Sequence, residues 1–170
     1  MALHDDLLEQ AWHLANREAA HPSQASLRRA ISAAYYALFH ALIAEAIVAL
    51  VPAEPPNLRP LIGRTFAHAD MKRACRAFMQ GASGLNPAMA SAITPPIRPE
   101  LLFVARTFAE LQETRHEADY DTLAVFSKNN VIDKIREAER SLGRLAAIRG
   151  EPNTNVFLAA LLFQERWRTR

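Results

Sequence analysis

The sequence predicts an all-α fold, and three features of its composition indicate this. Only 5 of the 170 residues are glycine, and alanine, leucine, arginine and glutamate, which favour helices, are abundant. No stretch alternates apolar and polar residues for long enough to predict a strand. Half of the residues are hydrophobic, which is enough for one core, so we predict a single domain over residues 1–170.

The first half of the chain predicts three helices separated by prolines. The first runs from about Asp5 to Ala20, and Pro22 interrupts the chain after it. The second begins near Ser23 or Ser26 and continues to about residue 51. A stiff connection follows because four prolines fall within nine residues, and the third helix then spans residues 61–80.

The second half predicts three more helices, so we expect about six in all. Residues 81–99, rich in glycine and proline, form the longest irregular loop and would be the rim of a site. The fourth helix begins at Pro99 or Glu100 and ends near Tyr120. The fifth is capped by Ser127 and ends before Gly150, which favours a left-handed exit. The last starts near residue 153 or 154 and contains the apolar run 156–163, leaving a basic tail over 164–170.

The net charge is only +2, but the charges are distributed unevenly. Segments 58–80 and 127–149 are basic, whereas segments 1–20 and 100–121 are acidic. Spacings of four place two cationic stripes on helices, namely Arg64, His68, Lys72 and Arg76, and Arg136, Arg140 and Arg144. Like charges one turn apart repel slightly, so each stripe is mildly unfavourable unless something compensates its charge. Three interpretations are open: the stripes pack against acidic helices of the same bundle, they are solvated, or they form a phosphate-binding surface.

The sequence predicts a cytoplasmic protein. Cys75 is the only cysteine, so no intramolecular disulfide can form, and the acidic N-terminal residues do not resemble a targeting peptide. Residues 30–51 approach the length and apolar content of a membrane span. They carry His40 and Glu45 near the middle, which favours a central core helix instead.

The second helix has three distinct sides. One is bulky, and Glu45 falls on it, so we expect a salt bridge to an arginine of another helix, with a carboxyl of raised pKa as the alternative. A second side is a strip of alanines, which allows close approach of a helix from this chain or from a second copy. The third side carries Arg29, Tyr36 and His40, which form either a hydrogen-bonded core network or a ligand-facing rim.

The fourth helix places an arginine where its apolar series predicts a core residue. Leu101, Val104, Phe108 and Leu111 recur every three or four residues, and Arg115 continues that series. A buried, unpaired guanidinium is costly, and Asp119 lies one turn further along the same side. The sequence therefore predicts an inward Arg115 paired with Asp119.

These two helices carry a resemblance to a known family. The segments RRAISAAYYALFHAL at 28–42 and RHEADYD at 115–121 resemble signature elements of the HEPN family (higher eukaryotes and prokaryotes nucleotide-binding). RTFAHADMKRAC at 64–75 falls where related sequences place a histidine-bearing helix. The resemblance implies an antiparallel up-and-down bundle that commonly forms homodimers, and in active members a metal-independent endoribonuclease site made by the motifs of two subunits.

The chain departs from that active-site pattern. In active members, four to six residues separate the motif arginine from a histidine. Here four residues separate Arg115 from Tyr120, and no histidine in the chain has an arginine at the required spacing before it. A tyrosine with an ordinary pKa near 10 is a poor proton carrier at neutral pH. If the chain were catalytic, Arg115 and Tyr120 would be the candidates, but we expect phosphate binding without cleavage.

From the resemblance we expect binding of nucleotide or RNA phosphate within a toxin–antitoxin or defence system, with an antitoxin or nucleotidyltransferase as partner and with no cofactor. The alternative is a helical protein-interaction module. The candidate binding residues are Arg115, Asp119, Tyr120, Arg29, Tyr36, His40, Arg64, His68 and Lys72.

Metal binding is the weaker interpretation of two other spacings. Glu18–His21 and Glu113–His116 have the i, i+3 spacing of ligands in di-iron helical bundles. Such a site needs two further inward carboxylates, for which only Glu45 is well placed. We therefore expect no metal site.

Overall fold

The computed structural model describes residues 2–18, 21–52 and 57–168, with side chains through residue 163. The described part is helical and contains no strand, which confirms the all-α prediction. It has eight α-helices rather than about six. They are α1 (Leu3–Asn16), α2 (Gln24–Leu50), α3 (Leu58–Gly63), α4 (His68–Met79), α5 (Pro87–Ala92), α6 (Pro99–Tyr120), α7 (Lys128–Ala147) and α8 (Pro152–Arg168), with a 3₁₀ turn, η1 (Gly81–Gly84), between α4 and α5.

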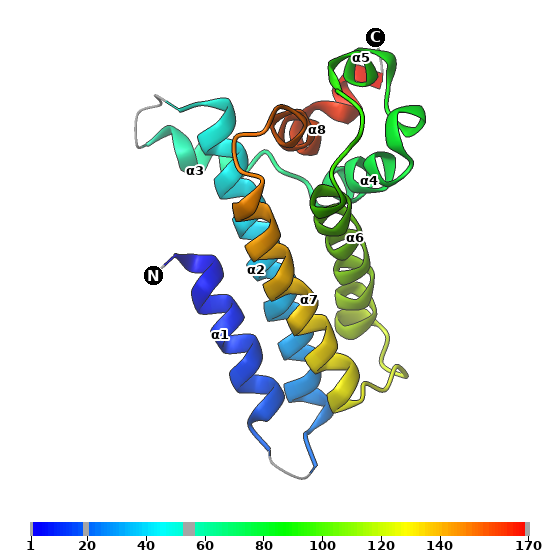
Figure 1. Cartoon of the computed structure of the whole chain (residues 1–170). Helices are drawn as coiled ribbons and strands as arrows, with labels where there is room; N and C mark the ends of the chain where they lie inside the picture. Colours follow the sequence, from blue (N-terminus) through cyan, green and yellow to red (C-terminus); the bar gives the residue numbers. More distant parts are fainter. Residues whose placement is uncertain (1, 19–20, 53–56, 169–170) are drawn as a thin grey trace.

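Four long helices form an antiparallel bundle. In Figure 1, α1 and α6 run in one direction, and α2 and α7 run in the other. Helix α2 packs against α1, α6 and α7, while α4, α5 and α8 gather at the end of the bundle where α6 begins. The up-and-down arrangement expected of the chain is thus present in these four helices.

Helix α2 is the centre of the core. Its side chains are buried on most sides between Ser26 and Ile47, and its most apolar 18-residue window is 61% buried inside the protein. By length and composition α2 could cross a membrane, and a buried core helix can have the same length and composition. Its neighbour α1 buries Ala11 and Ala15, so small residues allow α1 to pack closely along α2.

Local signals predicted most helix boundaries correctly. The Ser23 side chain accepts a hydrogen bond from the Ser26 amide, and Ser127 does the same for Asn130, so both serines cap their helices. Pro99 occupies the first turn of α6, and Gly150 has a φ of 78° after α7. Helix α1 ends at Asn16, short of the predicted Ala20. Residues 19 and 20 lie outside the described residues.

The single helix predicted over residues 61–80 is wrong. Residues 64–67 separate α3 from α4, with Ala67 extended at the N-cap of α4. The Thr65 hydroxyl donates to the Ile62 carbonyl over 2.6 Å, and the following Phe66 is buried in the core. The side-chain hydrogen bond competes with helix continuation at this point, and burial of Phe66 favours the break. Arg64 therefore does not share a helix with His68.

The irregular loop predicted over residues 81–99 is also wrong, because it contains η1 and α5. Leu85, Met89 and Ile93 are buried at intervals of four, and the Asn86 side chain caps α5 by accepting from the Met89 amide. Burial of these three side chains overrides the glycines and prolines around them. Helix α8 begins at Pro152 and continues to Arg168, so it is longer than predicted. The side chains of the predicted basic tail lie outside the described residues.

Candidate functional site

Arg115 faces the interior of the bundle, as its place in the apolar series of α6 predicts. Its side chain is 15% exposed, and its Nη2 donates a hydrogen bond of 2.9 Å to the Tyr36 hydroxyl on α2. Its Nε lies 2.8 Å from Asp119 Oδ2, which makes an ion pair, but this buried N–H lacks the alignment of a hydrogen bond. Burial opposes the charge, yet Tyr36 and Asp119 outweigh it and raise the pKa of the guanidinium.

Asp119 is itself held by the neighbouring helix. Its Oδ1 accepts a hydrogen bond of 2.8 Å from the hydroxyl of Ser32 on α2. The carboxylate thus joins α2 to Arg115 of α6, and it fixes one edge of the guanidinium. Sequence reasoning paired Asp119 with Arg115 correctly, but the role of Ser32 was missed because Ser32 lies 87 residues away along the chain.

Tyrosine rings surround the guanidinium. The Arg115 guanidinium carbon lies 5.7 Å from the ring centre of Tyr35, 5.5 Å from that of Tyr36 and 5.9 Å from that of Tyr120. These distances are within the range of cation–π attraction. Tyr120, at 66% exposure, is the most solvent-accessible of the three, so it lies at the outer edge of the site.

His68 joins this site from α4. Its ring centre lies 4.3 Å from that of Phe39 and 6.0 Å from that of Tyr36, and the Tyr35 hydroxyl is 2.6 Å from its Nδ1. Burial raises the pKa of Tyr35, so its hydroxyl stays protonated. In the His68 tautomer that is protonated at Nε2, Nδ1 accepts the hydrogen bond from this hydroxyl.

His40 continues the aromatic cluster along α2. Its ring stacks on Tyr36 with centres 6.2 Å apart. Burial, followed by the charge of His4, lowers the pKa of His40. Burial, Arg115 and His40, in that order, lower the pKa of His68. Both histidines are therefore neutral near pH 7, so neither adds charge to the cluster.

This cluster predicts a pH-dependent stability. Because the folded-state pKa values of His40 and His68 lie below the ordinary histidine value of 6.5, the stability that their neutral forms contribute is complete above that pH. It is lost as the pH falls below 6.5 and through the folded-state pKa values. We expect the free energy of unfolding to decrease between about pH 7 and pH 5, by at most about 1.4 kcal/mol per pH unit for each proton taken up. Urea titrations across this range measure the slope.

The control for that prediction is a pair of histidine replacements. His40→Gln with His68→Gln should flatten the slope between about pH 7 and pH 5, and glutamine keeps an acceptor for Tyr35. Glu18, Glu100 and Glu113 have lowered pKa values, so the stability that they contribute is lost below the ordinary glutamate value of 4.5, outside this window. An unchanged slope in the double variant would contradict the prediction.

Three predicted binding residues lie outside the cluster. Arg29 is exposed on α2, two turns before Tyr36, and Arg64 is exposed after α3. Lys72 on α4 forms a salt bridge of 3.2 Å with Glu113 of α6, and Arg76 contacts the same carboxylate. The part of the cationic stripe that does lie on α4 is therefore compensated within the bundle, which was one of the interpretations left open by the sequence.

A groove of about 740 Å³ lies beside these ion pairs between α4 and α6. Its lining carries Lys72, Arg73 and Arg76 together with Glu113, Glu117 and Asp121, so its formal charges balance. His116 lines it too, and the His116 ring lies 4.8 Å from that of Tyr120. This groove is polar, but it offers no excess of positive charge to a phosphate.

No family model, curated protein or solved structure matches this chain.

Arg28 has a structural role that sequence reasoning missed. Its Nη1 donates to the carbonyls of Ala118 and Asp121, both over 2.8 Å, and its Nη2 donates to that of Ala124 over 2.5 Å. The guanidinium also lies 5.5 Å from the ring centre of Phe126. One arginine at the start of α2 thus closes the C-terminal end of α6 and fixes the connection to α7. Nothing in the local sequence distinguishes Arg28 from Arg29.

Glu45 is paired with an arginine, as predicted. Arg149 Nε donates to Glu45 Oε2 over 2.8 Å, and Arg149 Nη2 contacts Oε1, so the pair is bidentate. Arg149 lies just beyond α7 rather than within a helix.

Within the described residues, no three histidine, cysteine, aspartate or glutamate side chains converge as a metal site requires. Glu18 and Glu113, the carboxylates of the two metal-like spacings, accept from Ser26 and pair with Lys72, respectively.

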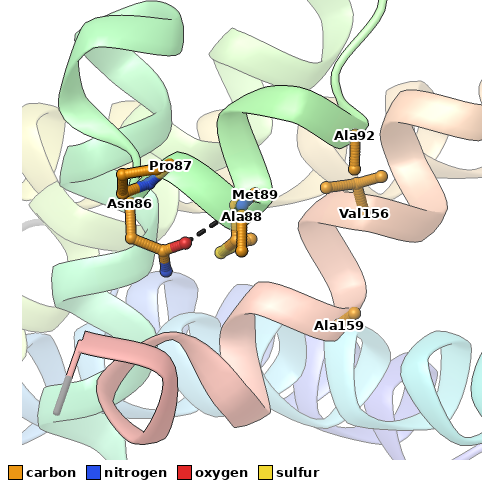
Figure 2. Close-up of a pocket in the computed structure, with 7 residues that line it drawn as sticks. All are labelled: Asn86, Pro87, Ala88, Met89, Ala92, Val156 and Ala159. Carbon is orange, nitrogen blue, oxygen red and sulfur yellow. Dashed lines mark hydrogen bonds between the residues drawn. The ribbon is translucent and has the colours of Figure 1, made fainter. Parts of the chain in front are cut away.

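A separate pocket of about 630 Å³ lies between α5 and α8, and Figure 2 shows its lining. Met89, Ala92 and Val156 are among the apolar side chains there, and Asn86 contributes an amide. Among the described lining residues none is ionisable, so this part of the pocket suits an apolar group. The Arg115 cluster is therefore the better candidate site for an anionic ligand.

Proposed function

We propose that this chain is an HEPN-like protein that binds the phosphate of a nucleotide or RNA at Arg115. We place it in the cytoplasm as a homodimer, within a toxin–antitoxin or defence system. One observation carries the proposal: Tyr36 and Asp119 hold the guanidinium of Arg115, and the Arg115 side chain is still 15% exposed. A guanidinium has five N–H donors, so the donors that face neither Tyr36 nor Asp119 can bond a phosphate oxygen.

The surroundings of Arg115 support an anionic ligand. Asp119 balances the charge of Arg115. His68 beside Arg115 and His40 beside Tyr36 are neutral because their pKa values are lowered. An arriving phosphate would favour protonation of these histidines, which would then add positive charge to the site. The aromatic faces of Tyr36 and Tyr120 flank the guanidinium, and such faces stack on nucleobases.

The test is binding of a fluorescent mononucleotide and of a labelled RNA to the wild-type chain and to Arg115→Ala. We expect the variant to lose about tenfold or more in affinity, since it removes a charge-assisted hydrogen bond to phosphate. The matched control is Arg149→Ala, which removes one charge beyond α7 and should change affinity by less than about twofold. Undetectable binding by the wild type at low salt would reject the proposal.

Cleavage is measured separately by incubating RNA with the protein and a chelator. Since Tyr120 stands where the motif histidine would be, we expect binding without cleavage. His68 is the histidine that the fold brings to this site, and its ring contacts that of Tyr36. RNA cleavage that disappears in His68→Ala would overturn this expectation and assign proton transfer to His68.

A protein-interaction module is the second candidate function, and one exposed surface favours it. The connection between α6 and α7 exposes Leu123 at 88% and Val125 at 81%. Arg28 and the Asp121 side chain fix its backbone, the latter by accepting from the Leu123 amide over 2.9 Å. Exposed apolar side chains on a fixed backbone are typical of a protein contact. Absence of nucleotide and RNA binding by a folded wild-type chain would favour this candidate.

A further inference from the structure

Three arginines surround one phenylalanine on the faces of α6 and α7 that lie side by side. The guanidinium carbons of Arg106, Arg140 and Arg144 lie 5.4, 6.0 and 3.8 Å from the ring centre of Phe103. We call this group the Phe103 arginine cluster. Arg144 and Phe103 are half-buried, whereas Arg106 and Arg140 are exposed. The cluster is therefore partly packed against the protein and partly accessible to solvent.

Within the described part of the chain, no ion pair joins a guanidinium of this cluster to a carboxylate. Four carboxylates on α6 and α7 pair with other cations: Asp133 with Arg136 at 3.3 Å, Glu110 and Glu137 with Lys134 at 3.2 and 2.9 Å, and Glu100 with Arg98 at 3.1 Å. Arg144 lowers the pKa of Glu100, but less than Arg98 does.

The basic stripes of α4 and α7 differ in whether carboxylates pair with their cations. On α4, Lys72 and Arg76 share Glu113, and Arg73 contacts Asp70, so that stripe is compensated by its own protein. On α7, Arg140 and Arg144 lie one turn apart, about 6 Å along the helix axis, and share the Phe103 ring. Three guanidiniums held this close repel one another unless an anion joins them.

We propose that the Phe103 arginine cluster binds the backbone phosphates of single-stranded RNA. This inference rests on the proposed function, and it adds a second contact surface about 18 Å along α6 from Arg115. A guanidinium bonds phosphate through two parallel N–H groups, and it also stacks on aromatic rings and bases. A row of guanidiniums beside an aromatic ring is the combination that proteins use to bind a single strand without reading its sequence.

The experiment measures fluorescence anisotropy of a labelled oligouridylate of about 20 nucleotides with the full chain at about 50 and 200 mM salt. We expect Arg140→Gln with Arg144→Gln to weaken binding about tenfold or more at the lower salt. The slope of log affinity against log salt should become shallower by about 1.4, since each lost phosphate contact on a single strand contributes about 0.7. Arg106→Gln, on the other helix, should weaken binding in the same direction.

The matched control is Arg136→Gln, which removes one charge from the same helix. Because Arg136 pairs with Asp133, this variant should change affinity by less than about twofold. Unfolding midpoints of all the variants establish that each is folded. Equal binding by the double variant and the wild type would overturn the inference, as would polyglutamate that competes as well as oligouridylate, since the surface would then fit an acidic protein.

The failure of this inference differs from that of the proposed function. If Arg115→Ala abolishes mononucleotide and RNA binding while the double variant binds RNA normally, the cluster has no role and the proposed function stands. If the double variant loses RNA binding while mononucleotide binding is independent of Arg115, the cluster is supported and the Arg115 site is rejected. Absence of RNA binding by the wild type at about 50 mM salt would overturn this inference, and absence of mononucleotide binding as well would overturn the proposed function too.

Discussion

Replacing Tyr35 with alanine is expected to lower the free energy of unfolding by about 4 kcal/mol, because it removes a fully buried aromatic ring from the centre of the core. Tyr35 is 0% exposed, and its ring centre lies 5.5 Å from that of Phe108 and 6.0 Å from that of Phe39. A chain of this length loses about 2–4 °C of melting temperature per kcal/mol, so we expect a decrease of about 8–16 °C. Urea and thermal unfolding both measure the change.

Two variants separate the ring of Tyr35 from its hydroxyl. Tyr35→Phe keeps the ring and should cost about 1–2 kcal/mol, since it leaves His68 Nδ1 without its hydrogen bond. Tyr36→Ala alters the adjacent, half-buried tyrosine and should cost less than Tyr35→Ala. Equal losses in Tyr35→Ala and Tyr36→Ala would contradict the assignment of Tyr35 to the core.

The second large effect is expected at Arg28. Arg28→Ala removes three hydrogen bonds to main-chain carbonyls and a contact with the Phe126 ring. We expect a loss of about 3 kcal/mol in the free energy of unfolding, since hydrogen bonds from charged donors are worth about 1.5–3 kcal/mol and part of this site is open to water. Arg28→Lys should recover little of the loss, because an ammonium cannot reach three carbonyls in the fork geometry.

Arg29→Ala is the matched control for this prediction, because the neighbouring arginine is exposed. It should change the free energy of unfolding by less than about 0.5 kcal/mol. Hydrogen exchange adds a local measurement, since loss of the Arg28 contacts should increase exchange at the end of α6 and in residues 121–126. Equal stability of Arg28→Ala and Arg29→Ala would show that Arg28 does not hold the connection between α6 and α7.

The two adjacent tyrosines show how one helix serves both core and site. Neighbouring residues on a helix point about 100° apart. Tyr35 therefore packs into the core, and Tyr36 accepts the hydrogen bond from Arg115. His68 joins both, through the Tyr35 hydroxyl and the Tyr36 ring. His68 thus joins the core tyrosine to the tyrosine of the candidate binding site.

The sequence by itself determined the features that depend on neighbours within one or two helical turns. Helix content, the serine caps at Ser23 and Ser127, the start of α6 at Pro99 and the pairing of Arg115 with Asp119 were all predictable, and the structure contains each of them. The physical reason is that helical periodicity, capping and i, i+4 pairing are local. The chain needs no tertiary information to specify them.

Only the tertiary structure decided which distant residues meet. The break before α4 and the packing of that helix brought His68 to Tyr35, Arg28 found three carbonyls at the end of α6, and Ser32 found Asp119. It also decided that carboxylates compensate the cations of α4 while Arg140 and Arg144 of α7 share Phe103 instead. These pairings join residues tens of positions apart, so they depend on how helix faces pack and not on any spacing along the chain.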